Sequence, residues 1–89
     1  MESDVAVQQL KDAVLGVAEG ARTSGETLNK LEHTLSGRGE KVQRKLQGTG
    51  HGADAQVAAS VGAALEAVKE ATQAMNQAQQ SAEDYAAQL

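Results

Sequence analysis

The chain contains no cysteine, proline, tryptophan or phenylalanine among its 89 residues, and Tyr85 is its one aromatic residue. The absence of cysteine excludes a disulfide framework and thiol chemistry. The absence of proline leaves long helices free of their strongest breaker. Alanine, glutamine, leucine and valine dominate instead, a composition that suits helices and gives strands little to build on. We therefore expect one all-α domain spanning residues 1–89.

Charge and hydropathy exclude several classes of partner. The formal net charge is −4, and acidic and basic residues alternate along the chain, so we expect no nucleic-acid binding. No apolar run approaches the roughly 18 residues of a membrane span, so we expect no stable membrane insertion. The first residues, MESDVAVQQLKDAV, carry acidic side chains where a secretory signal peptide carries positive ones. Any export would therefore use a route without a classical signal peptide.

A cluster of glycines divides the chain into two arms. The segment Gln47–Asp54 reads QGTGHGAD and holds Gly48, Gly50 and Gly52. Each glycine inside a helix costs about 1 kcal/mol relative to alanine, so a turn is favoured here. The sequence predicts a helix over about 3–46, a turn over 47–53 and a second helix over about 54–88.

Apolar residues in both arms recur at alternating spacings of three and four, as along the seam of a coiled coil. In the first arm this row comprises Val7, Leu10, Val14, Val17, Ala21, Ser24, Leu28, Leu31 and Leu35. In the second arm it comprises Val57, Val61, Ala64, Val68, Ala71, Met75, Ala78, Ala82, Tyr85 and Leu89. A fold at Gln47–Gly52 sets large residues of one row against small residues of the other, for example Leu35 against Ala64. We predict an antiparallel two-helix hairpin.

Two sites in the first arm could interrupt the predicted helix. Thr23 and Glu26 have the spacing of a capping box, which would restart a helix there, but the apolar row keeps its phase across them. Gly37 and Gly39 form a second candidate turn, which we interpret as a kinked or frayed end of the first arm. A bend at these glycines would give no matching register.

The predicted seam is narrow and rich in alanine. Two helices that share it bury too little apolar surface to offset the ordering of about 80 residues. We therefore expect a dimer, with itself or with a related helical hairpin, that forms a four-helix bundle. The residues expected in the hairpin and dimer seam are Leu10, Val14, Val17, Leu28, Leu31, Leu35, Val61, Val68, Met75 and Leu89.

No catalytic, cofactor or metal site is expected. His33 and His51 have no further ligands at useful spacing, and a metal site needs three or four converging donors. The glycine segment lacks the Lys-Ser/Thr ending of a phosphate-binding loop. A rod of two helices offers no deep pocket in which reactants could be desolvated. The sequence predicts a protein that is not an enzyme.

Charge and one tyrosine give the rod distinct ends. Arg38, Lys41, Arg44 and Lys45 lie beside the bend, whereas Glu2, Asp4, Glu83 and Asp84 lie at the open end. The basic cluster either stabilises the C-terminus of the first helix or docks an acidic surface. Opposite charges at the two ends favour antiparallel pairing of rods. Tyr85 is either a seam residue or an exposed anchor for recognition.

These features together resemble the WXG family, the small helical-hairpin substrates of type VII secretion systems. The family carries Trp-x-Gly at its bend, and the matching residues here are Gly50, His51 and Gly52, with Gly50 in place of tryptophan. The family's export signal places a tyrosine near the end of the second helix and an acidic residue four positions later. Tyr85 occupies the tyrosine position, and Leu89 stands where the acidic residue is expected.

The resemblance implies a non-enzymatic substrate or partner of a type VII secretion system, exported without a classical signal peptide. It also implies a secretion ATPase as a candidate partner through Tyr85. Two alternatives remain open. One is a cytoplasmic structural or adaptor coiled coil unrelated to secretion, and the other is an amphipathic helix that coats membranes or granules. The sequence lacks the aromatic and lysine-rich flanks that such membrane-coating helices favour.

Overall fold

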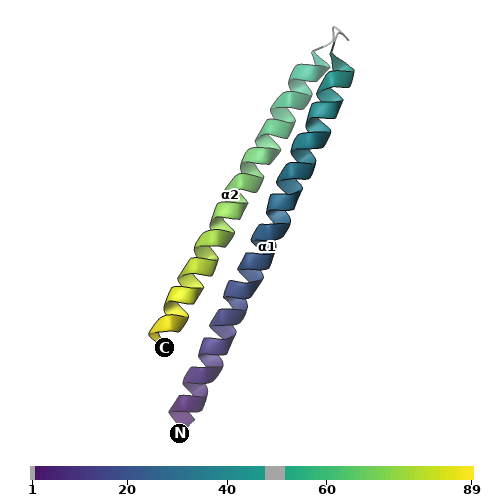
Figure 1. The fold of residues 1–89 in the computed structure, drawn as a ribbon. Helices are drawn as coiled ribbons and strands as arrows, with labels where there is room; N and C mark the ends of the chain where they lie inside the picture. Colours follow the sequence, from purple (N-terminus) through teal and green to yellow (C-terminus); the bar gives the residue numbers. More distant parts are fainter. Residues whose placement is uncertain (1, 48–51) are drawn as a thin grey trace.

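The computed structural model describes residues 2–47 and 52–89, which form two long helices packed side by side (Figure 1). Helix α1 spans Glu2–Leu46 and helix α2 spans Ala53–Gln88. They run antiparallel, and the chain ends lie at the end of the rod opposite the bend. The expected all-α hairpin is thereby confirmed. No strand occurs in the described ranges.

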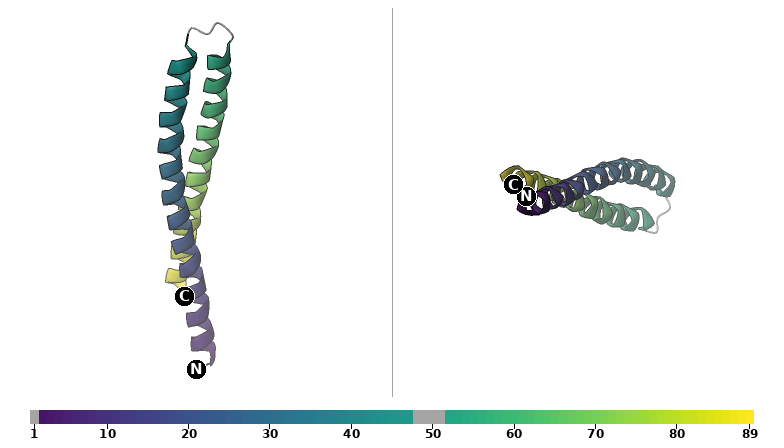
Figure 2. Two further views of the ribbon diagram at one scale, coloured as in Figure 1. Left: turned by 90° about the vertical axis from the view of Figure 1, so that its right-hand side faces the viewer. Right: turned by 90° about the horizontal axis from the view of Figure 1, so that it is seen from below.

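The hairpin is a thin rod. It measures 73 × 14 × 13 Å, with a radius of gyration of 20.3 Å. A compact domain of the same length would have a radius of gyration of about 12 Å. Helix α1 extends beyond α2 at the open end, and the helices cross at a shallow angle (Figure 2).

Gly52 marks the start of α2. Its φ of 69° and ψ of 5° are left-handed, a conformation that glycine adopts at little cost. The backbone N–H of Gln56 donates to the Gly52 carbonyl at 3.1 Å, which closes the first turn. Of the predicted bend motif, Gly50 and His51 lie outside the described residues.

Helix α1 runs without interruption through both of its candidate breaks. At the first, the Thr27 hydroxyl donates to the Thr23 carbonyl at 3.1 Å, so this threonine pair bonds within the helix. The expectation of a kinked or frayed end at Gly37 and Gly39 was wrong, because the helix continues to Leu46. Gly39 is buried against α2, and packing there offsets the low helix propensity of glycine.

The buried and half-buried residues along the contact between the helices recur at alternating spacings of three and four residues. In α1 this seam comprises Lys11, Val14, Ala18, Ala21, Gly25, Leu28, Glu32, Leu35 and Gly39. In α2 it comprises Val61, Leu65, Val68, Thr72, Met75, Gln79, Ala82 and Ala86. Gly39 faces Val61, and Gly25 faces Met75, so the register lies one residue away from the expected pairing.

Half of each expected row differs from the observed seam. Val14, Leu28 and Leu35 belong to it, as do Val61, Val68 and Met75. In the hairpin, however, Ala18, Gly25 and Glu32 take the inward positions in place of Val17, Ser24 and Leu31. At positions 18 and 25 the smaller residue of each neighbouring pair lies on the seam, where it allows the two helices to approach closely; size does not explain Glu32.

The closest approach of the two helices occurs at Gly39. A Cβ atom at this position would lie 2.7 Å from Cγ1 of Val61, a distance at which the Val61 side chain or one of the helices must shift. At Gly37, two residues earlier in the same helix, a Cβ atom would meet nothing within 4 Å. Glycine is therefore required sterically at position 39 and not at position 37.

Substitution of these two glycines tests the packing. Gly37→Ala should stabilise the protein by about 1 kcal/mol through helix propensity alone. In Gly39→Ala, overpacking that typically costs about 1–3 kcal/mol should cancel or reverse that gain. Urea unfolding of both variants measures the difference, and Val61→Ala should restore the benefit of Gly39→Ala. Equal stabilisation by both alanines would contradict the close approach.

Candidate binding face

The two long sides of the hairpin differ in charge, and the seam defines them. Residues that directly precede a seam residue lie on one side of each helix, and residues that directly follow one lie on the other. Because α1 and α2 are antiparallel, the preceding residues of both helices gather on the same face of the rod. The following residues gather on the opposite face.

Between 10 and 34 in α1 and between 60 and 85 in α2 the preceding residues form an uncharged face, and Arg38, which precedes Gly39, continues this row near the bend and carries a charge. In α1 they are Leu10, Ala13, Val17, Gly20, Ser24, Thr27, Leu31 and Thr34, and in α2 they are Ser60, Ala64, Ala67, Ala71, Ala74, Ala78, Ser81 and Tyr85. Val17 is 61% exposed and Tyr85 is 47% exposed, and Leu10 and Leu31 are similarly open. This uncharged face therefore presents large apolar side chains to solvent in the lone hairpin.

The following residues form a charged face. Its ionisable members are Asp12, Glu19, Arg22, Glu26, His33, Glu40, Glu66, Lys69 and Glu83. Leu15, which is 42% exposed, is its large apolar member. A shallow groove at its centre is lined by Arg22, Glu26 and Asn29 of α1 and by Thr72, Asn76 and Gln79 of α2.

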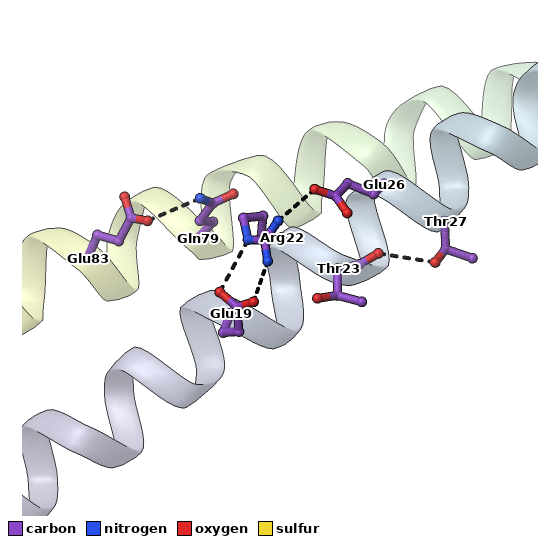
Figure 3. A network of polar contacts seen from close by, with 7 residues as sticks. All are labelled: Glu19, Arg22, Thr23, Glu26, Thr27, Gln79 and Glu83. Carbon is purple, nitrogen blue, oxygen red and sulfur yellow. Dashed lines mark hydrogen bonds and ion pairs between the residues drawn. The ribbon is translucent and has the colours of Figure 1, made fainter.

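Arg22 organises the polar contacts of the charged face (Figure 3). Its guanidinium pairs with Glu19 and donates to Glu26 at 2.7 Å. The hydrogen bond and charge of Arg22 hold the pKa of Glu19 below its ordinary value. On α2, Gln79 donates to Glu83 at 3.1 Å. These groups are satisfied within their own helices and stay in water.

Other predicted sites lie apart from both faces or remain outside the description. Arg44 and Lys45 occupy the last turn of α1, where positive charge complements the helix dipole. Arg44 also donates to the Glu40 carbonyl at 3.5 Å. His33 is exposed, and His51 lies outside the described residues. Leu89, which is 38% exposed, ends the chain beside the open end of the rod.

The described residues hold no group of three or more His, Cys, Asp or Glu side chains that could bind a metal ion. Neither described helix is long and apolar enough to cross a membrane. No family model, curated protein or solved structure matches the chain. The uncharged face is therefore the feature of this protein that points to a function.

Sequence reasoning did not find this face as a separate feature. It grouped Val17 and Leu31 with the residues buried inside the hairpin. The missed signal was that no position directly before a seam residue is charged between 10 and 34 or between 60 and 85. This pattern becomes visible only when the buried row is known.

The rotation of α1 can be tested with two adjacent residues. Ala18 is 4% exposed, so Ala18→Leu should overpack the seam and destabilise the protein by about 1–3 kcal/mol. In the lone hairpin Val17 is exposed, so Val17→Leu should change the stability of the hairpin itself by about 0.5 kcal/mol or less, as expected for a surface position. Denaturation of both variants at one protein concentration gives the comparison. A larger loss from Val17→Leu would place Val17, and not Ala18, in the seam.

Proposed function

We infer that this protein is a non-enzymatic binding protein whose helical hairpin pairs with a second helical hairpin through the uncharged face. The observation that carries this proposal is the separation of charge between the two sides of the rod. A lone rod would gain nothing from keeping this side free of charge between 10 and 34 and between 60 and 85. Pairing through that side would remove Leu10, Val17, Leu31 and Tyr85 from water, which is favourable for apolar surface.

The exposed area of the rod supports the same proposal. The lone hairpin exposes 6397 Å², whereas a compact monomer of 9.2 kDa exposes about 4,900 Å². Its buried apolar core, within the part that the structure describes, consists of Ala18, Ala21, Val68, Ala82 and Ala86. Four of these five are alanines and supply little apolar area. Pairing with another hairpin into a four-helix bundle would supply the missing core.

We further propose that the protein works as a WXG-like substrate or partner of a type VII secretion system. The support is the resemblance of its two-helix architecture, its glycine-containing bend and a tyrosine near the end of the second helix. In the lone hairpin Tyr85 is exposed and lies in the last turn of α2, from which it can reach a pocket on a secretion ATPase. In this proposal the protein leaves the cell without a classical signal peptide.

Charge placed on either side of the rod tests the pairing function. Val17→Lys introduces a charge on the uncharged face and should raise the dissociation constant of the pair by about tenfold or more, because burying an unpaired charge is costly. Leu15→Lys is the matched control, since it adds the same charge two residues away on the charged face. Sedimentation equilibrium measures both. Lysine is a better helix former than valine, so lost helicity would not explain the effect. An equal effect of the two lysines would contradict the assignment of the face.

Substitution of Tyr85 tests the link to secretion. Tyr85 is half-exposed in the lone hairpin, so Tyr85→Ala should leave the fold of the hairpin intact, but it should weaken pairing and abolish export or ATPase docking. Tyr85→Phe, which keeps the ring, is the control for packing. The assay compares culture supernatants of the native host with and without its secretion ATPase. Unchanged export of Tyr85→Ala would remove Tyr85 as the signal, and export independent of the ATPase would favour an adaptor function.

A further inference from the structure

We propose that the partner of the uncharged face is a second copy of this chain, which lies antiparallel with α1 against α1 and a two-fold axis at Ser24. This inference rests on the pairing function proposed above and names its partner. Three independent observations carry it: the symmetry of the uncharged face along α1, the opposite charges at the two ends of the rod, and the area that the rod leaves exposed.

The first observation is the spacing of the outward residues of α1. Leu10, Val17, Ser24, Leu31 and Arg38 repeat every seven residues, with Ser24 at the centre. Ser24 is also the middle residue of α1, which spans Glu2–Leu46. An antiparallel copy with its axis at this point overlaps α1 along the whole length of the helix. No other member of the row gives both full overlap and symmetry.

The resulting register sets compatible residues against one another. Val17 of one copy lies opposite Leu31 of the other, and the small Ser24 lies opposite itself. Leu10 lies opposite Arg38, whose aliphatic stem can cover it while the guanidinium reaches water. The register between the two α1 helices also fixes the position of α2, because α1 and α2 are paired within each hairpin. Tyr85 of one copy then lies opposite Ala67 of the other. Large residues thus meet small or aliphatic ones, as interdigitated packing requires.

The second observation is charge. At the open end Asp4, Asp12, Glu83 and Asp84 outweigh Lys11, and near the bend Arg38, Lys41, Arg44 and Lys45 outweigh Glu40. In the proposed register Asp4 of one copy lies opposite Arg44 of the other. A parallel copy would instead place acidic end beside acidic end and basic end beside basic end. Complementary charge therefore selects the antiparallel arrangement.

The third observation is area. The exposed surface of 6397 Å² exceeds that of a compact monomer by roughly 1,500 Å². A standard stable interface buries about 800 Å² on each partner. The surplus surface of the whole rod is therefore larger than the area that one partner loses in a complete interface.

Single cysteines test this arrangement cleanly, because the chain contains none of its own. The purified full chain is treated with a short bifunctional thiol reagent. Ser24→Cys should become a covalent dimer. Val17→Cys and Leu31→Cys, one carrying an affinity tag, should each remain uncross-linked alone and should form a mixed dimer when combined. Asn29→Cys, on the charged face of the same helix, is the control and should remain uncross-linked.

Other outcomes would overturn the proposal in identifiable ways. Cross-linking of Val17→Cys to itself would show parallel copies, and cross-linking of Asn29→Cys would show that the charged face is used. Sedimentation of the wild-type chain as a folded monomer at micromolar concentration would exclude a second copy as the partner. If such a monomer bound a related hairpin and lost that binding in Val17→Lys, the proposed function would stand without this inference.

Discussion

The close approach of two helices along a row of small residues is the constraint on which the rest of this structure depends. Ala18, Ala21, Gly25 and Gly39 line the inward side of α1, and at Gly39 the Val61 side chain occupies the space that a Cβ atom would need. Such a seam buries little apolar area for its length. It instead gains from close contact between the small residues of α1 and the side chains of α2, because dispersion contacts are numerous where two surfaces meet closely.

This choice of seam determines the two sides of the rod. With small residues inside the hairpin, the larger side chains of the same heptads, Leu10, Val17 and Leu31, turn toward one outer side. The charged residues that follow the seam lie on the other side, where Arg22 bridges Glu19 and Glu26. Exposed ion pairs of this kind contribute little to stability. Their main effect is to keep that side of the rod in water and unsuited to apolar pairing.

Much of the fold could be predicted from the sequence, and the remainder could not be for a physical reason. The glycines between Gln47 and Asp54 and the absence of proline elsewhere indicate two long helices, and matched spacing in the two arms indicates their antiparallel register to within one residue.

The rotation of each helix is harder to predict. The heptad pattern of α1 is compatible with either Val17 or Ala18 facing α2, and the larger apolar side chain of Val17 favours Val17. The tight approach of the helices decides for Ala18, but this is a property of the pair that neither helix reveals alone. The charge-free side follows from that rotation and was missed with it.

Because only one of the two faces of the rod is uncharged, the number of chains that can associate is also limited. Two copies that meet through the same face form an isologous, closed contact, and the charged faces of both then point outward. A rod with apolar residues on both sides would offer a second surface to a third copy and would grow into fibres. Here Leu15 is the large apolar residue on the charged face, and Glu19 and Asp12 flank it at the next turns. The pattern of charge therefore favours a discrete pair of hairpins, and it does so through what the charged face excludes as much as through what the uncharged face attracts.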